Sequence, residues 1–165
     1  MFIGSNIVKP DTKGRIAIPA RHRDRLRDCC GSRVTVTMHP LGGHSLWMYP
    51  WNEWESVYET VSRLSPLRPE NARLQHILLS NAFELELDSQ GRVLLPPGLR
   101  AHANIDQGGE VAIVGLGKRF EIWEAGASRA GSLLVRLPLE IAGLFEDWLR
   151  AHYPKRADRV LKDHL

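Results

Sequence analysis

The chain reads Asp11-Thr-Lys-Gly-Arg-Ile-Ala-Ile-Pro-Ala-Arg-His-Arg23 near its start, and the pattern returns, offset by 77 positions, as Asp88-Ser-Gln-Gly-Arg-Val-Leu-Leu-Pro-Pro-Gly-Leu-Arg100. The match continues downstream: Val34-Thr-Val-Thr37 corresponds to Val111-Ala-Ile-Val114 at the same offset, and Ser45-Leu-Trp47 to Glu121-Ile-Trp123 with a slip of one residue. Two copies of one unit in a single chain can pack as a pseudo-dimer about a pseudo-two-fold axis. The sequence therefore predicts two related halves that present one basic motif twice.

Each copy opens with the residues of a tight turn. Asp11 and Asp88 stand three positions before Gly14 and Gly91. An aspartate at the start of a type I turn accepts hydrogen bonds from the amides inside it, and a glycine supplies the residue with positive φ. We expect this turn to close a hairpin, with one strand before it and one after it.

Alternation marks the strands around the turns. Before the second turn, Phe83-Glu-Leu-Glu-Leu87 alternates apolar and acidic residues. After each turn, the apolar residues share one face, which leaves Arg15 and Arg92 on the other. Pro19 and Pro96 end these strands, because proline cannot donate to a sheet, and they suit the first turn of a short helix. The residues predicted on the apolar face are Ile16, Ile18, Val93 and Leu95.

Two other stretches have the periodicity of helices. Between the repeats, apolar residues from Trp51 to Leu78 recur at spacings of three and four, with Pro66 and Pro69 as a break, and we interpret this stripe as packing between halves or subunits. Near the end, apolar residues between Pro138 and Leu149 predict an amphipathic helix that docks on the body or on a neighbouring subunit. The predicted segments are a first repeat at 1–52, linker helices at 53–80, a second repeat at 81–126 and a C-terminal helical extension at 127–165.

Composition allows a packed core and places positive charge unevenly. The chain has 165 residues, of which 43% are hydrophobic, and a formal net charge of +3. From Asp11 to Arg33, seven Lys and Arg residues are set against three Asp residues, so this segment holds more than the whole excess. Such a patch is the electrostatic footprint of a nucleic-acid partner, and the alternative is a solvated helix face.

Three further motifs accompany the two Asp-x-x-Gly-Arg-x-x-x-Pro blocks: Met1-Phe-Ile-Gly4, the segment from Ala72-Arg-Leu74 to Ala82, and Glu121-Ile-Trp123. Taken together, these motifs resemble the MraZ family of bacterial transcriptional regulators, which are built from two AbrB-like units. The resemblance covers roughly residues 1 to 125. One Asp-x-x-Gly-Arg turn is a weak signal, whereas two at this spacing, each followed by the same strand and Trp, are a strong one.

The resemblance implies an α+β protein, mainly β, in which a tandem AbrB-like swapped-hairpin barrel carries linker helices and a C-terminal helix. It also implies a homo-oligomeric ring that binds short tandem repeats in double-stranded DNA upstream of cell-division and cell-wall genes, with repression as the expected effect. Such a protein would be cytoplasmic and nucleoid-associated.

The site residues follow from the matched motif positions. Arg15 and Arg92 are expected at base edges, Lys13 and Gln90 at a phosphate or a base edge, and Arg23 at phosphates, with Arg100 as its counterpart in the second copy. The predicted structural residues of the turns are Asp11, Gly14, Pro19, Asp88, Gly91 and Pro96.

The basic segment also allows a second hypothesis. An oligomeric interaction protein could use the same patch to bind an acidic protein partner. A shift of duplex DNA that survives competitor DNA would favour the regulator, and a shift lost with any competitor would favour the second hypothesis or nonspecific binding.

Enzymatic and cofactor-dependent functions find no support in the sequence. His39 and His44 flank a predicted hairpin tip without a third metal ligand, and Gly115-Leu-Gly-Lys-Arg119 lacks the following helix of a phosphate-binding loop. No nucleophile elbow is present. We therefore expect no enzyme activity, no metal, no cofactor and no small-molecule substrate.

The cysteines, the lack of a long apolar run and His22 give three further expectations. The adjacent Cys29 and Cys30 cannot easily bridge one another, which indicates a reducing cytosol. The absence of a long apolar run predicts no membrane span. His22 matches Leu99 of the second copy, and we expect a half-buried neutral histidine there, with pH sensing as the alternative.

Overall fold

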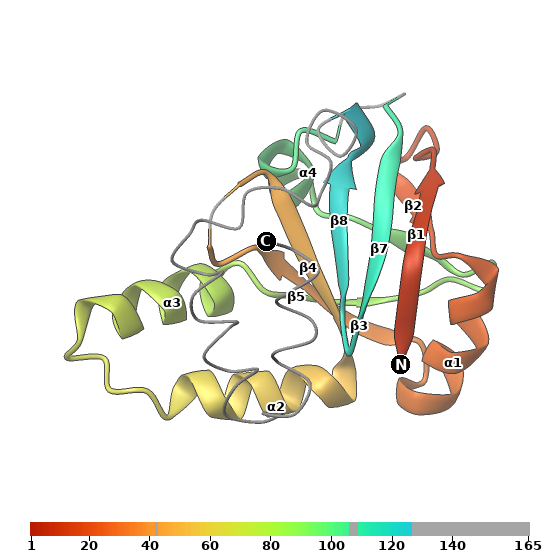
Figure 1. The fold of residues 1–165 in the computed structure, drawn as a ribbon. Coiled ribbons are helices and arrows are strands. Elements are labelled where there is room, and N and C mark those ends of the chain that lie inside the picture. The colour runs from red at the N-terminus through yellow and green to blue at the C-terminus, as the bar shows by residue number, and fades with distance from the viewer. Residues whose placement is uncertain (42, 106–108, 127–165) are drawn as a thin grey trace, which may run out of the picture. The chain divides into compact units, whose positions relative to one another are not determined.

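The computed structural model describes residues 1–41, 43–105 and 109–126 (Figure 1). The expected C-terminal helical extension at 127–165 lies outside the described residues. Within the described part, the elements follow in the order β1 (Phe2–Val8), β2 (Arg15–Ala17), α1 (Ala20–Cys30), β3 (Arg33–Met38), β4 (Ser45–Pro50), α2 (Trp51–Ser62), α3 (Pro69–Ser80), β5 (Phe83–Glu86), β6 (Arg92–Leu94), α4 (Pro97–His102), β7 (Val111–Gly117) and β8 (Phe120–Glu124).

Six of these strands form one sheet in the order β1-β7-β8-β4-β3-β5, and β2 pairs separately with β6. Every neighbouring pair is antiparallel. In Figure 1, β1, β7 and β8 run side by side although β1 lies at the opposite end of the chain from the other two. The protein therefore has the mixed α+β architecture that the sequence predicted.

The strand order is unchanged when the two halves of the chain are exchanged. The exchange turns β1 into β5, β7 into β3 and β8 into β4, and the order then reads the same from the other edge. The register has the same symmetry, since Val8 faces Val111 and Leu85 faces Val34, two pairs that the 77-residue offset interconverts. The strands of the two halves are thus interleaved.

The strands on either side of each turn do not form the hairpin that the sequence predicted. β1 pairs with β7 and β2 with β6, so the first turn joins two different ladders. The turns themselves have the expected geometry: Gly14 and Gly91 have φ of 82° and 72°, and each donates its N–H to the carbonyl of the aspartate three residues earlier at 2.9 Å. The hairpin prediction was wrong because the strand partners come from the other half of the chain.

One hydrophobic core combines residues from both halves. Ile16, Ile18, Val93 and Leu95 have no exposed surface, as the alternation predicted. Because these four residues belong to the same cluster, separating the halves would expose apolar surface on both sides. Other members of the core include Phe2, Leu26, Val36, Met48, Leu99, Ile113, Phe120 and Ile122.

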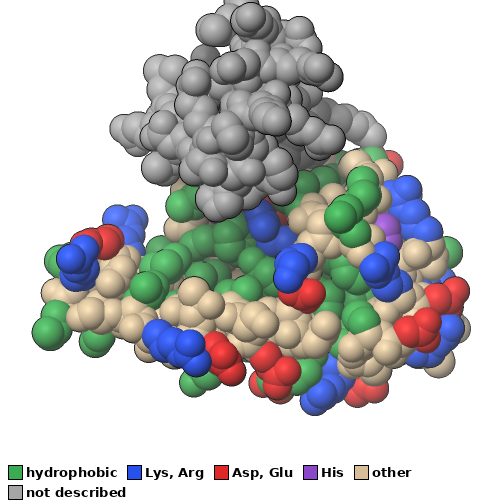
Figure 2. Space-filling view, turned by 60° about the horizontal axis from the view of Figure 1, so that its bottom comes forward, with side chains coloured by type: hydrophobic (Ala, Val, Ile, Leu, Met, Phe, Trp, Pro, Cys, Tyr) green, Lys and Arg blue, Asp and Glu red, His purple; other side chains and the backbone are tan. Residues whose placement is uncertain are grey.

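α2 and α3 carry the apolar stripe of the linker. In α2, Trp54 is buried whereas Tyr58 is 53% exposed. In α3, the carbonyl of the buried Leu78 accepts a hydrogen bond from Thr37 Oγ1 of β3 at 2.8 Å. Figure 2 shows hydrophobic side chains gathered around a hollow on the face that carries α2. A groove of about 430 Å³ is lined by Thr35, Trp51, Trp54, Glu55, Tyr58, Leu79, Ala82 and Glu84.

His22 is more deeply buried than the sequence predicted, with 6% of its surface exposed. Its ring lies edge-on to Phe2 and Phe120, at centroid distances of 5.5 Å and 5.2 Å. Burial lowers the pKa of His22, and the positive charges of Arg21 and Arg25 lower it further. The imidazole is therefore neutral at pH 7 and acts as a core residue.

We expect His22→Leu to make folding less sensitive to acid. The pKa of His22 is lower in the folded than in the unfolded chain, so its contribution to stability is present above the unfolded value of about 6.5 and is lost as the pH falls below it. Leucine is the residue at the matching position, Leu99. Urea unfolding at about pH 7.5 and about pH 5.5 should show a smaller loss of stability in the variant than in the wild type.

His76→Leu provides the control, because His76 is exposed on α3. The stability of this variant should depend on pH as that of the wild type does. His39 keeps part of the acid sensitivity in both variants, since burial also lowers its pKa. If His22→Leu lost stability as steeply as the wild type, His22 would not be a source of the acid sensitivity.

Candidate nucleic-acid interface

The two Asp-x-x-Gly-Arg blocks meet at the β2–β6 ladder. Ile16 faces Val93, its own counterpart in the repeat, so the pseudo-two-fold axis passes through this pair. Both side chains are buried, and the alternation of a strand turns their neighbours Arg15 and Arg92 to the opposite side. Two motifs that are 77 positions apart in the sequence therefore share one surface.

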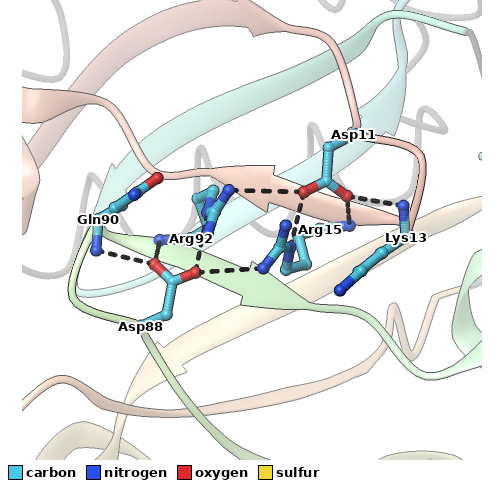
Figure 3. A network of polar contacts seen from close by, with 6 residues as sticks. All are labelled: Asp11, Lys13, Arg15, Asp88, Gln90 and Arg92. Carbon is cyan, nitrogen blue, oxygen red and sulfur yellow. Dashed lines mark hydrogen bonds and ion pairs between the residues drawn. The ribbon is translucent and has the colours of Figure 1, made fainter.

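Their side chains form a closed ring of ion pairs, the Asp–Arg quartet of Asp11, Arg15, Asp88 and Arg92 (Figure 3). Arg15 Nε donates to Asp11 Oδ2 at 2.6 Å, and Arg15 Nη1 lies 3.8 Å from Asp88 Oδ2. Arg92 Nε donates to Asp88 Oδ2 at 2.8 Å, and Arg92 Nη1 lies 3.7 Å from Asp11 Oδ2. Each aspartate thus binds the arginine of its own half and contacts that of the other half.

The second oxygen of each carboxylate holds its turn. Asp11 Oδ1 accepts from the amides of Lys13 and Arg15 at 2.9 Å and 3.0 Å. Asp88 Oδ1 accepts from the equivalent amides of the second turn, both at 2.9 Å. These hydrogen bonds, led by the amide of the arginine in each motif, lower the pKa of both aspartates. Both carboxylates are ionised at neutral pH, and the quartet has no net charge.

The two arginines are held in place and still have donors to offer. Their side chains are 27% exposed, and the contacts of the quartet engage Nε and Nη1. Among the described residues, neither Nη2 atom has a hydrogen-bond partner. Because a guanidinium has five N–H donors, each arginine can bind a further acceptor without leaving the quartet.

Arg23 and Arg100 lie across the turn glycines of the opposite half. A Cβ atom at Gly91 would collide with the side chain of Arg23, and one at Gly14 with that of Arg100. Arg23 Nε also donates to the carbonyl of Ile18 at 2.6 Å. Each half therefore supports the turn of the other, and a role of these arginines in DNA binding stays a prediction.

Lys13 and Gln90 stand at the exposed tips of the two turns (Figure 3). Their backbone amides bind the aspartates, and no hydrogen bond to the described residues engages the amide group of Gln90 or the ammonium group of Lys13. The two halves consequently offer different chemistry at the same position, a cation in one and a neutral amide in the other.

The remaining arginines of the basic segment have structural contacts as well. Arg21 Nη2 donates to Asn6 Oδ1 at 2.5 Å, and Arg25 Nη1 donates to the carbonyl of Met1 at 2.9 Å. These bonds connect α1 with the N-terminal strand β1. The charges of Arg21 and Arg25 are therefore held by contacts within the first half.

The histidines that the sequence analysis weighed as metal ligands have other contacts. The ring of His39 lies 4.7 Å from that of Trp47, and His44 Nδ1 lies 2.9 Å from the carbonyl oxygen of His102. Among the described residues, no group of three or more His, Cys, Asp or Glu side chains could hold a metal ion.

The Gly115–Arg119 stretch ends one strand and turns into the next. Gly115, Leu116 and Gly117 end β7, and the amide of Leu116 donates to the carbonyl of Arg119 at 2.8 Å, so the turn that joins β7 to β8 lies at Lys118 and Arg119. No helix in the described part of the chain is long and apolar enough to span a membrane.

Sequence reasoning missed one property of Asp11 and Asp88. It assigned them to their own turns and did not predict their contacts with the arginine of the other half. The repeat was the available signal, but the contact follows only when β2 pairs with β6.

Comparison with known proteins gives one consistent result. Residues 1–77 and 78–127 match the model of the MraZ protein family, described as antitoxin-like. The transcriptional regulator MraZ of Pseudomonas putida is 39% identical over 150 residues, which is 91% of this chain and 97% of that protein. Proteins of the same name from Saccharophagus degradans and Nitrosospira multiformis are 45% and 40% identical, over 74% and 76% of this chain and 82% of each relative.

Gly91→Ala should destabilise the protein more than Gly31→Ala. Both glycines have positive φ, 72° and 59°, where a Cβ atom costs about 1 to 2 kcal/mol. Only at Gly91 would the new atom also collide with Arg23, whereas nothing lies within 4 Å of it at Gly31. Urea unfolding should show an additional loss of about 1 kcal/mol in Gly91→Ala. Equal losses would mean that Arg23 moves aside at no cost.

Proposed function

The chain belongs to the MraZ family, and from this premise we propose that it is a transcriptional regulator that binds specific sequences in double-stranded DNA. Its relatives are named transcriptional regulators. The observation that carries the proposal is the Asp–Arg quartet, which holds two arginines on one surface of a two-stranded antiparallel ribbon. A ribbon of this kind fits the major groove of B-DNA.

The exposed groups suggest how the contacts are divided. The donors of Arg15 and Arg92 that the quartet does not engage suit the O6 and N7 acceptors of guanine, and the amide of Gln90 suits an adenine edge. Lys13 suits a phosphate, which fixes position and carries no sequence information. Arg23 and Arg100 border the same turns and would add positive charge beside them.

We extend the proposal to the units of the chain and to its assembly. Residues 1–52 and 81–126 would be the AbrB-like units of a swapped-hairpin barrel, 53–80 the linker and 127–165 a helical extension. The exposed Tyr58 and the groove beside α2 support a subunit contact, and the closure of such contacts into a ring rests on the family resemblance. Repression of cell-division and cell-wall genes from tandem DNA repeats, at the nucleoid, rests on the family resemblance.

Selection of bound duplexes from a random DNA pool tests the proposal directly. The expected outcome is an enriched sequence whose complex survives excess unrelated DNA. If any competitor DNA abolished binding, the proposal of a sequence-specific regulator would be excluded. This outcome would favour the alternative, an oligomeric protein whose basic segment binds an acidic protein partner.

Arg92→Lys keeps the positive charge and removes the planar fork of donors. We expect a loss of about 1 to 3 kcal/mol in affinity for the selected sequence and a relaxed base preference at one position, with nearly unchanged binding to unrelated DNA at low salt. Arg15→Lys should behave in the same way at another position. Arg63→Lys, in an exposed ion pair just after α2, is the matched control. Wild-type base preference in both quartet variants would exclude these arginines as readers of sequence.

Binding by a ring predicts that the spacing of the DNA repeats matters. Successive motifs reach one face of the duplex only when the repeats are in phase with its helical turn of about 10 to 10.5 base pairs. Moving one repeat by about five base pairs should forfeit most of the gain from simultaneous binding, roughly 10² to 10⁴-fold, and a shift of about ten should largely restore it. Affinity that ignores the half-turn shift would leave only independent binding to single repeats.

A further inference from the structure

We propose that Asp11 and Asp88 are positioning residues of the DNA interface, and that each carboxylate holds the arginines of both halves, so that the two halves contact DNA as one coupled unit. This inference rests on the proposed function. By charge alone, the two carboxylates would repel the phosphates of DNA. The proposal assigns them a role that favours DNA binding.

A single oxygen atom in each carboxylate connects the halves. Asp11 Oδ2 accepts from Arg15 Nε at 2.6 Å and lies 3.7 Å from Arg92 Nη1. Asp88 Oδ2 accepts from Arg92 Nε at 2.8 Å and lies 3.8 Å from Arg15 Nη1. A shift of one guanidinium therefore changes the contacts of an oxygen that also faces the other guanidinium.

Orientation is the benefit that these carboxylates bring. A free arginine side chain loses rotamer freedom when it binds, and this loss reduces affinity. In the quartet, Nε and Nη1 of each arginine are already held by opposite charges before DNA arrives. The guanidinium is therefore preorganised, with Nη2 left as a donor.

The two oxygens of each aspartate divide the structural and the positioning tasks. Oδ1 accepts the turn amides, whereas Oδ2 contacts the two guanidinium groups. Asparagine keeps one oxygen, and it is favoured in turns of this kind. Asp→Asn at either position should therefore preserve the turn and weaken the hold on the arginines.

The experiment compares Asp88→Asn and Asp11→Asn with the wild type on the selected duplex. Each substitution adds one unit of positive charge, so nonspecific electrostatics predicts tighter binding. We expect instead roughly tenfold or greater weakening on the selected sequence, with no loss on unrelated DNA. Asp24→Asn is the matched control, because Asp24 is an exposed aspartate on α1 outside the quartet. It should bind as tightly as the wild type or more tightly.

Variants that lack one or both arginines of the quartet distinguish a positioning role of Asp88 from a general structural effect. Asp88→Asn should still weaken binding when Arg92 is replaced by Ala, because Asp88 also contacts Arg15. It should not weaken binding further when both Arg15 and Arg92 are Ala. An equal loss in this double background would overturn the inference, since Asp88 would then act through its turn.

A readout without DNA tests the coupling and does not depend on the proposed function. In nuclear magnetic resonance spectra of the free protein, Asp11→Asn should shift the Nε–H signal of Arg92, in the other half, as well as that of Arg15. Unchanged Arg92 signals, or Asp→Asn variants that bind like Asp24→Asn, would overturn the inference. If the wild-type protein showed no preference among duplexes, the proposed function would be excluded instead. This outcome is seen with the wild type alone, before any variant is made.

Discussion

The pairing of β2 with β6 is the contact on which both the core and the candidate interface depend. At its centre, Ile16 and Val93 meet with no exposed surface, and burial of a side chain of this size stabilises the fold by about 1.5 to 3 kcal/mol. Ion pairs at a partly exposed surface stabilise much less. Apolar burial therefore holds the ladder together, and the Asp–Arg quartet on its outer side decides where the two arginines point.

The same principle recurs where the pseudo-two-fold axis crosses the large sheet. Leu46 of β4 faces Ile122 of β8, again two positions related by the repeat, and both are buried. Beside them, the buried carboxylate of Glu121 accepts hydrogen bonds from the indole N–H of Trp47, in the other half, at 3.0 Å and of Trp123 at 3.3 Å. At both crossings an apolar pair joins the halves, and a carboxylate bridges them.

Symmetry in the backbone coexists with difference in the side chains. The turns have the same hydrogen bonds, yet one tip carries Lys13 and the other Gln90. The quartet is neutral, so the attraction to phosphates that we propose must come from groups around it, such as Lys13 and the arginines of α1. A duplex would then meet two oriented guanidinium groups within a basic surround, and the arrangement separates sequence reading from overall attraction.

The sequence by itself determined the repeat, the turn glycines and the inward face of Ile16, Ile18, Val93 and Leu95, because turn chemistry and alternation are local properties of the chain. Its motifs also indicated the family to which the comparisons assign the chain. It did not determine which strands pair. The predicted hairpin does not form, and strands of different halves pair instead, because the backbone donors and acceptors along a strand edge are the same in both halves. Only the tertiary structure placed Asp11 beside Arg92 and Arg23 over Gly91. Those contacts depend on the register of strands far apart in the sequence, which is fixed by burial of a core that both halves share.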